Sequence, residues 1–271
     1  MSFQTLNKKE LVYLTSDIFT GVRHGFSTRK GGVSPAPWDS LNLDDRRGDD
    51  HANVQENFRR LCNALEMDVQ RAVLSKQVHR DDVRVVTEAD AGKGLWIPQD
   101  YDSADALITN VPDLPLFVFS ADCGVILLHD PVHHAIGAVH AGWRGTVMGI
   151  VKKAVEAMAD AYGTDPRDVQ AAIGPSIGQC CFETDDDVPT ALRQTLGSAA
   201  EPFMTWNGRK WHIDLKSVNR HWLHSAGVTH IDLCDHCTYC LPELYWSHRR
   251  TGLARGEQAA VIALLPNKEL P

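Results

Sequence analysis

Short apolar segments alternate with turn-forming residues through the first half of the chain. Each segment is rich in branched or aromatic side chains and too short for a typical helix, which is the pattern of buried β-strands. The predicted strands are Ala72–Leu74, Val83–Val86, Ala106–Ile108, Leu116–Phe119, Val125–Leu128 and Ile136–Val139. We expect these strands to form one mixed sheet.

The spacing of apolar residues becomes helical after this region. From Thr146 to Tyr162 they recur three or four positions apart, which predicts a helix that Thr146 caps and Gly163 ends. The remaining predicted elements are the helices Asp186–Leu196 and Leu215–Ala226, the second ended by Gly227, and the strands Val169–Ile173 and Ala259–Leu265. The pattern predicts an α/β or α+β fold in which helices cover a mixed sheet.

Length and composition limit the class of protein. No linker, repeat or low-complexity tract divides the 271 residues, so we expect one domain over residues 1–271. The longest apolar runs are too short to cross a membrane, and the first ten residues do not resemble a signal peptide. Seven cysteines, an odd number, predict free thiols in the cytoplasm. A formal net charge of −8 argues against a nucleic-acid partner.

Three potential metal ligands follow predicted strands. His79, Cys123 and His140 each lie where a strand leaves the core, and side chains at strand ends can converge on one pocket. Two imidazoles and a thiolate suit zinc, and three protein ligands leave a fourth position for water, as in catalytic sites. Considered singly, each residue is equally explained as an ordinary core or surface group. Asp122 precedes Cys123, but strand alternation would direct it to the opposite face, so we do not assign it as a general base.

The turn Ala141-Gly-Trp-Arg-Gly145 joins a predicted strand to the helix that follows. Its backbone N–H groups would lie at the positive end of that helix, and Arg144 adds a cation suited to phosphate or a carboxylate. A plain tight turn with a surface arginine explains the same residues. Arg249, Arg250 and Arg255 are further candidate anion contacts, for which surface pairing is the alternative.

Other segments could carry chemistry or merely reverse the chain. Cys234, Cys237 and Cys240, with His236 between them, resemble a metal-binding hook, but a structural site normally pairs two such hooks and the second is missing. The segments 24–34 and 174–183 are glycine-rich turns that could contact a substrate.

Taken together, the motifs resemble those of the YfiH-type laccase-domain family, also called multicopper polyphenol oxidases. The matching segments run in order along nearly the whole chain: His24-Gly-Phe-Ser-Thr-Arg29, Gly31-Gly-Val-Ser34, Leu41-Asn-Leu43, Gln77-Val-His79, Ala104-Asp-Ala-Leu-Ile-Thr109, Ala121-Asp-Cys123, Val139-His-Ala-Gly-Trp-Arg-Gly-Thr146, Gly174-Pro-Ser-Ile-Gly178 and Ser247-His-Arg-Arg250.

The resemblance implies a fold, a metal site and an activity. The fold would be a single α/β/α sandwich related to toxin deamidases of the cytotoxic-necrotizing-factor type, and His79, Cys123 and His140 would ligate zinc. The implied activity is phosphorolysis of adenosine, inosine and 5′-methylthioadenosine, together with adenosine deamination. Zinc-activated water could attack purine C6, while phosphate near Arg144 could attack ribose C1′. We predict a zinc-dependent purine nucleoside enzyme with these four residues in its active site.

Alternative activities follow from the same resemblance. One is a Cys–His amidase that removes L-serine from a peptidoglycan precursor, with Cys123 as nucleophile and His140 as base. Another is a copper-dependent polyphenol oxidase, for which one His/Cys/His set supplies too few ligands for several coppers. A binding protein that keeps the pocket without catalysis ranks last, because no interaction module is apparent.

Overall fold

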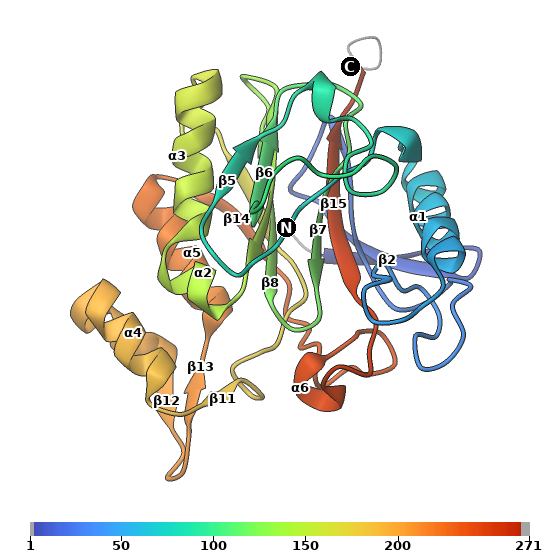
Figure 1. The fold of residues 1–271 in the computed structure, drawn as a ribbon. Helices are drawn as coiled ribbons and strands as arrows, with labels where there is room; N and C mark the ends of the chain where they lie inside the picture. Colours follow the sequence, from blue (N-terminus) through green and yellow to red (C-terminus); the bar gives the residue numbers. More distant parts are fainter. Residues whose placement is uncertain (1–2, 267–271) are drawn as a thin grey trace.

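The computed structural model describes residues 3–266 and contains two large sheets packed face to face. Figure 1 shows the sheets side by side, with α1 outside one and α3 and α5 outside the other. The molecule is therefore built of four layers in the order helix, sheet, sheet, helices. The predicted mixed α/β fold is confirmed, but the prediction of one sheet in a three-layer sandwich is wrong. A continuous apolar run shows that a strand is buried on both faces without showing which sheet it joins.

The first sheet contains both ends of the described chain. Its strand order is β1-β2-β3-β15-β7-β4, with only β4 and β7 pairing in parallel. The strands are β1 (Phe3–Lys8), β2 (Leu11–Ser16), β3 (Val22–Ser27), β15 (Gln258–Leu264), β7 (Leu116–Ser120) and β4 (Val73–Leu74). The last strand thus lies between the N-terminal strands and the middle of the chain.

The second sheet carries the strands that frame the candidate site. Its order is β14-β10-β8-β9-β6-β5, parallel at its two edges and antiparallel between them. The strands are β14 (His230–Leu233), β10 (Gln170–Ile173), β8 (Gly124–Asp130), β9 (Ala135–Ala141), β6 (Ala106–Thr109) and β5 (Val83–Val85). A small sheet of β11 (Glu183–Thr184), β13 (Trp211–Ile213) and β12 (Met204–Trp206) lies apart from both.

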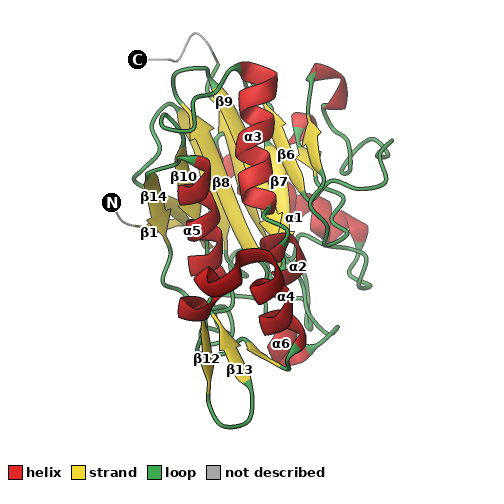
Figure 2. Ribbon diagram, turned by 90° about the vertical axis from the view of Figure 1, so that its left-hand side faces the viewer, coloured by secondary structure: helices red, strands yellow, loops and turns green. Residues whose placement is uncertain are grey.

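Alternate residues of the buried strands belong to different interfaces. In β15, Ala260 and Ile262 join the core between the sheets, whereas Val261 and Ala263 face α1 (His51–Leu65). On the other side, α3 (Ile150–Tyr162) and α5 (Leu215–Ala226) cover the second sheet, as Figure 2 shows. This double coverage explains why both faces of the strand are apolar.

The predicted helix Thr146–Tyr162 is divided in two. Residues Trp143–Val147 form α2, and α3 begins only after Gly149, whose φ of 73° is left-handed and interrupts the helical path. Thr146 therefore lies inside α2 and donates from its hydroxyl to the carbonyl of Ala141, so the predicted cap is wrong. Gly163 ends α3 in a left-handed conformation, as predicted.

Two other helices closely match their predictions, and one was missed. Helix α4 spans Asp187–Leu196, and α5 ends at Gly227. The missed helix, α1, buries Val54, Phe58, Leu61 and Leu65, a regular stripe that the sequence contained. The remaining short helices are η1 (Val69–Arg71), η2 (Glu88–Asp90), η3 (Gly197–Phe203) and α6 (His248–Thr251). Among residues 3–266, no helix has the length and apolar character needed to cross a membrane.

Candidate active site

His79, Cys123 and His140 converge at one end of the second sheet. His79 lies in the loop before β5, Cys123 in the tight connection from β7 to β8, and His140 near the end of β9. Their potential ligand atoms all lie within 4.8 Å of one another, and the imidazole rings meet edge to face at 4.9 Å between centroids. His140 is buried and Cys123 partly so, while His79 is exposed at the mouth. The group therefore opens to solvent on one side.

A glycine makes this convergence sterically possible. A Cβ atom on Gly142 would lie 2.7 Å from Nδ1 of His79 and 3.3 Å from Sγ of Cys123. Any other residue would displace the candidate ligands. The glycine of the predicted turn thus leaves room for the three side chains to meet.

Asp105 orients two of the three residues. Its carboxylate accepts a hydrogen bond of 2.8 Å from Nδ1 of His140, which leaves Nε2 of that ring for a metal or a thiol. It also accepts the backbone N–H groups of Val78, His79 and Arg80 at 3.0, 3.0 and 3.2 Å, holding His79 at a left-handed φ of 60°. Sequence reasoning assigned no role to Asp105, although it lies in one of the matching motifs.

The side chains of the group polarise one another. Burial alone would raise the pKa of Cys123, but the nearby His140 and the hydrogen bonds from both imidazoles lower it to about 6. Burial would lower the pKa of His140, yet the Cys123 thiolate and the Asp105 carboxylate raise it to about 9. Burial would raise the pKa of Asp105, but hydrogen bonds from His140 and the backbone leave it lowered. Without a metal, the group is a thiolate–imidazolium pair next to a carboxylate.

The open side of the group faces a cleft of about 550 Å³. His79 and Cys123 line its floor, and Trp143 and Arg144 of α2 line one wall. Arg144 stacks on the Trp143 ring at 4.2 Å, and among residues 3–266 no carboxylate forms an ion pair with it. Since α2 has only five residues, the expected helix-dipole contribution is small, and the guanidinium itself is the main anion-binding feature.

The other candidate arginines have different environments. Arg255 and Arg47 line the cleft, but both pair with the buried carboxylate of Glu257. Arg249 also lines the cleft, where it stacks over a phenylalanine and has no ion-pair partner in the described chain. Arg250 is not among the lining residues and donates to the carbonyl of Tyr239. Two cations, Arg144 of α2 and Arg249 of α6, are therefore available to an anion.

The segment 174–183 forms the opposite wall of the cleft. Ile177, Phe182 and Glu183 line it, and Asp185 and Asp187 extend the acidic side. None of residues 24–34 is a lining residue, so that predicted substrate segment lies elsewhere.

Asp122 lines the cleft beside Cys123, so the prediction that strand alternation directs it to the opposite face is wrong. Its carboxylate accepts hydrogen bonds from the hydroxyls of Thr238 and Ser247 and from the backbone N–H of Arg249. It thereby positions the N-terminal end of α6. Strand alternation does not apply to Asp122, because it lies in a turn between two strands rather than in a strand.

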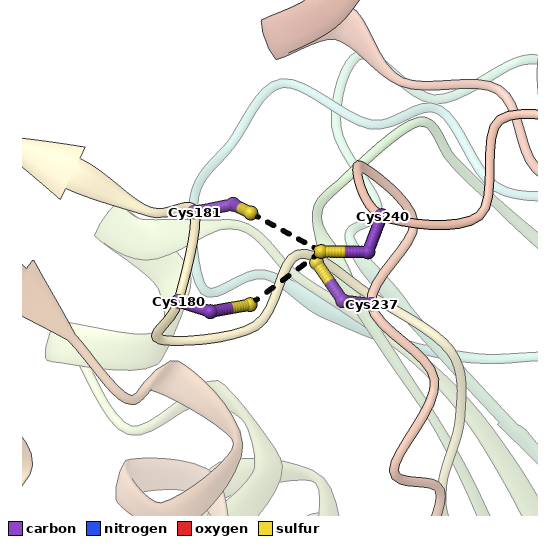
Figure 3. Close-up of side chains that lie close together, drawn as sticks. All are labelled: Cys180, Cys181, Cys237 and Cys240. Atoms are coloured by element: carbon purple, nitrogen blue, oxygen red, sulfur yellow. Dashed lines mark hydrogen bonds between the residues drawn. The ribbon is translucent and has the colours of Figure 1, made fainter.

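The cysteines of the candidate hook, whose metal binding the sequence left open, lie together only in part. Cys237 and Cys240 meet Cys180 and Cys181 of segment 174–183, so the missing pair of thiols comes from a distant loop (Figure 3). Cys234 is buried outside this group, and His236 hydrogen-bonds to the hydroxyl of Tyr245. The sequence contained the adjacent cysteines but gave no indication that the two loops touch.

A family model described as multi-copper polyphenol oxidoreductase laccase matches residues 23–265. The chain belongs to this family. It is 37% identical over 258 residues to purine nucleoside phosphorylase YlmD of Geobacillus stearothermophilus, covering 93% of this chain and 92% of that protein. It is 39% identical over 248 residues to a purine nucleoside phosphorylase of Deinococcus radiodurans, covering 92% and 91%.

Solved structures of the laccase-type family share the fold. The crystal structure of YlmD from Geobacillus stearothermophilus has a TM-score of 0.90 at 35% identity and covers 97% of this chain and 99% of that one. Bacillus licheniformis protein YfiH has a TM-score of 0.89 at 32% identity and covers 97% and 98%. The predicted family membership is confirmed.

Proposed function

We propose that this laccase-type protein is a zinc-dependent purine nucleoside phosphorylase whose zinc is held by His79, Cys123 and His140. The observation that carries the proposal is the open side of this three-ligand group, which faces a cleft lined by two guanidinium groups that form no ion pair among residues 3–266. The names of the relatives support the choice of substrate, because both are called purine nucleoside phosphorylases. The two substrates of such an enzyme, a nucleoside and phosphate, need a reactive group and an anion site in one cavity.

The residues present fit zinc. Two imidazoles and one thiolate are a borderline-soft donor set, the Cys123 pKa is already lowered, and Gly142 leaves the space in which the donors meet. Zinc bound there would supply a Lewis acid with one open coordination position. Asp105 would fix the ring of His140 and the backbone at His79, which is the usual role of a carboxylate behind a ligating histidine.

The walls of the cleft suit the remaining parts of the substrate. Arg144 and Arg249 would bind phosphate through charge-assisted hydrogen bonds, and the rings of Trp143 and Phe182 offer faces for a purine. Phosphorolysis forms a bond from a phosphate oxygen to ribose C1′ while the C1′–N9 bond breaks. The bonding electrons leave with the purine, whose N9 then takes a proton.

The experiment compares products from adenosine, inosine and 5′-methylthioadenosine with and without phosphate. Free purine base that appears only with phosphate, and disappears in Cys123→Ala along with the zinc held by His79, Cys123 and His140, is the expected result. Inosine and ammonia formed from adenosine without phosphate would add the proposed deamination. If Cys123→Ala kept the full zinc content and turnover of the wild type, the assignment of the site would be wrong.

A second candidate is a metal-independent Cys–His amidase. The chain of contacts from Cys123 through His140 to Asp105, with a lowered thiol pKa and a raised imidazole pKa, is the arrangement of a nucleophile, a base and an orienting carboxylate. An L-serine-containing peptidoglycan precursor would be its substrate. Zinc-free protein that cleaves this precursor, loses activity on alkylation and leaves nucleosides intact would favour this function.

Copper-dependent polyphenol oxidation is the third candidate. Among residues 3–266, the groups able to hold a metal are one His/Cys/His set and one set of four thiols. Several coppers working together would need more imidazole ligands than this.

A cytoplasmic location belongs to the main proposal, since closely spaced free thiols persist in a reducing compartment.

A further inference from the structure

We propose that Cys180, Cys181, Cys237 and Cys240 form a second metal site, a structural zinc centre distinct from the candidate active site. The four sulfur atoms all lie within 4.8 Å of one another. In Figure 3 the side chains extend from two facing loops and their sulfurs point toward a common centre. Each loop contributes two thiols, which is the paired arrangement of structural zinc sites.

The spacing of the sulfurs fits a single small ion. A Zn–S bond of about 2.3 Å in a tetrahedral site separates neighbouring sulfurs by roughly 3.8 Å. The Sγ atoms of Cys180 and Cys240 are 3.8 Å apart, and those of Cys181 and Cys240 are 3.4 Å apart. An iron–sulfur cluster would hold its cysteines at its outer corners and would need the two loops to separate.

The surroundings of Cys237 favour its thiolate form, since burial would raise the pKa of this thiol but a backbone N–H group leaves it lowered. The backbone N–H of Gly178 donates to Sγ of Cys237 at 3.2 Å, a contact that stabilises negative charge on sulfur. A Cβ atom on Gly178 would lie 3.3 Å from Cβ of Cys237 on the facing loop, so this glycine lets the loops approach. Four thiolates around a divalent ion carry a net charge of −2. Two guanidinium groups of α6 contact these loops: Arg249 donates to the carbonyl of Cys181 and Arg250 to that of Tyr239.

The site would support the wall of the candidate active-site cleft. Cys181 precedes Phe182, which lines the cleft, and Ser176 bridges to Cys237 at the base of the loop. Zinc would therefore join segment 174–183 to the loop that leads into α6. Its role is to position this wall, and it takes no part in the reaction. The proposal does not depend on which substrate the cleft accepts.

A disulfide is the competing explanation for close cysteines. The 3.4 Å between the sulfurs of Cys181 and Cys240 exceeds a covalent bond of about 2.05 Å, but a modest movement could close it. A disulfide would consume two of the four ligands and abolish the zinc site. Metal content and thiol state therefore distinguish the two explanations.

The experiment uses the full-length Cys123→Ala variant, purified under reducing conditions and equilibrated with zinc, so that the candidate active site lacks a ligand. We expect about one tightly bound zinc per chain and four sulfur neighbours at about 2.3 Å by X-ray absorption spectroscopy. Adding Cys237→Ser and Cys240→Ser should remove that zinc. Adding Cys234→Ala instead is the matched control, because Cys234 belongs to the same loop but lies outside the group, and zinc should remain.

The spectroscopic measurement keeps the test decisive if the multiple variant fails to fold. A folded Cys123→Ala protein without zinc, or with zinc that has nitrogen or oxygen neighbours in place of four sulfurs, would overturn the proposal. So would a mass lower by two hydrogens located at Cys181 and Cys240. These results leave the nucleoside assay on the wild-type protein unaffected, so a failure here is separate from a failure of the proposed function.

Discussion

Replacing Asp105 with asparagine tests whether this carboxylate organises the metal ligands. The carboxylate accepts four hydrogen bonds, one from Nδ1 of His140 and three from the backbone N–H groups of residues 78–80. The asparagine amide keeps one accepting oxygen, but its NH₂ group is a donor and would face N–H groups that also donate. Some of these N–H groups would therefore lose their acceptor. Hydrogen bonds to charged groups contribute about 1.5–3 kcal/mol each, so we expect a measurable loss of stability.

The expected loss of zinc affinity is about 10- to 100-fold, as for other carboxylates behind ligating histidines. This range corresponds to roughly 1.4–2.8 kcal/mol of binding free energy. Without Asp105 the pKa of His140 falls from its raised value, so protons compete less with zinc at pH 7 than in the wild type. This partly offsets the loss at neutral pH. The defect in Asp105→Asn should therefore be larger at pH 9 than at pH 7.

The assay is competition for zinc against a chromophoric chelator at both pH values, together with thermal unfolding. Asp130→Asn is the matched control: Asp130 is equally buried, accepts two backbone N–H groups and bonds Nδ1 of His133 at 2.8 Å, but lies at the opposite end of β8. It should lose stability and keep its zinc affinity. An Asp105→Asn protein that melts earlier yet binds zinc within twofold of the wild type would refute the reasoning.

Three further predictions concern Gly142 beside the candidate metal ligands, the anion site and the pH dependence of stability. Gly142→Ala should fold but bind zinc at least about tenfold more weakly in the same competition assay. The reason is that the added Cβ would lie 2.7 Å from Nδ1 of His79. A zinc affinity equal to that of the wild type would contradict this prediction. Arg144→Gln should raise KM for phosphate about tenfold without changing the zinc content. Arg250 lies outside the lining of the cleft, so Arg250→Gln should leave KM for phosphate unchanged. Equal effects of the two substitutions on KM would argue against an anion site at Arg144. Burial lowers the pKa of His129 from 6.5 to about 4, so the unfolded chain takes up its proton first. The stability from this group is complete above about pH 6.5 and falls by about 3 kcal/mol as the pH drops toward 4. When the free energy of unfolding is measured with urea across this pH range, it should change less steeply with pH in His129→Gln than in the wild type. An unchanged pH dependence would contradict the prediction.

Local sequence patterns determined the elements whose ends are marked by neighbouring residues. Helix α5 stops where Gly227 adopts a left-handed conformation, and α3 stops at Gly163 for the same reason. The strands from β4 to β9 begin or end within a few residues of their predicted bounds, because buried β-segments are short runs of branched residues. The three candidate zinc ligands were named from sequence, but their positions after such runs left ordinary core or surface roles open, and the family resemblance carried the choice.

Tertiary structure decided how these pieces are combined. The same apolar runs are compatible with one sheet or two, and strand pairing depends on partners more than a hundred residues away, as for β15 between β3 and β7. Asp105 acquired its role only when β6 placed it behind His140, and Cys180 and Cys181 became partners of Cys237 and Cys240 only when two loops met. Sequence periodicity records which face of a segment is buried, whereas contacts between distant segments depend on the packing of the whole chain.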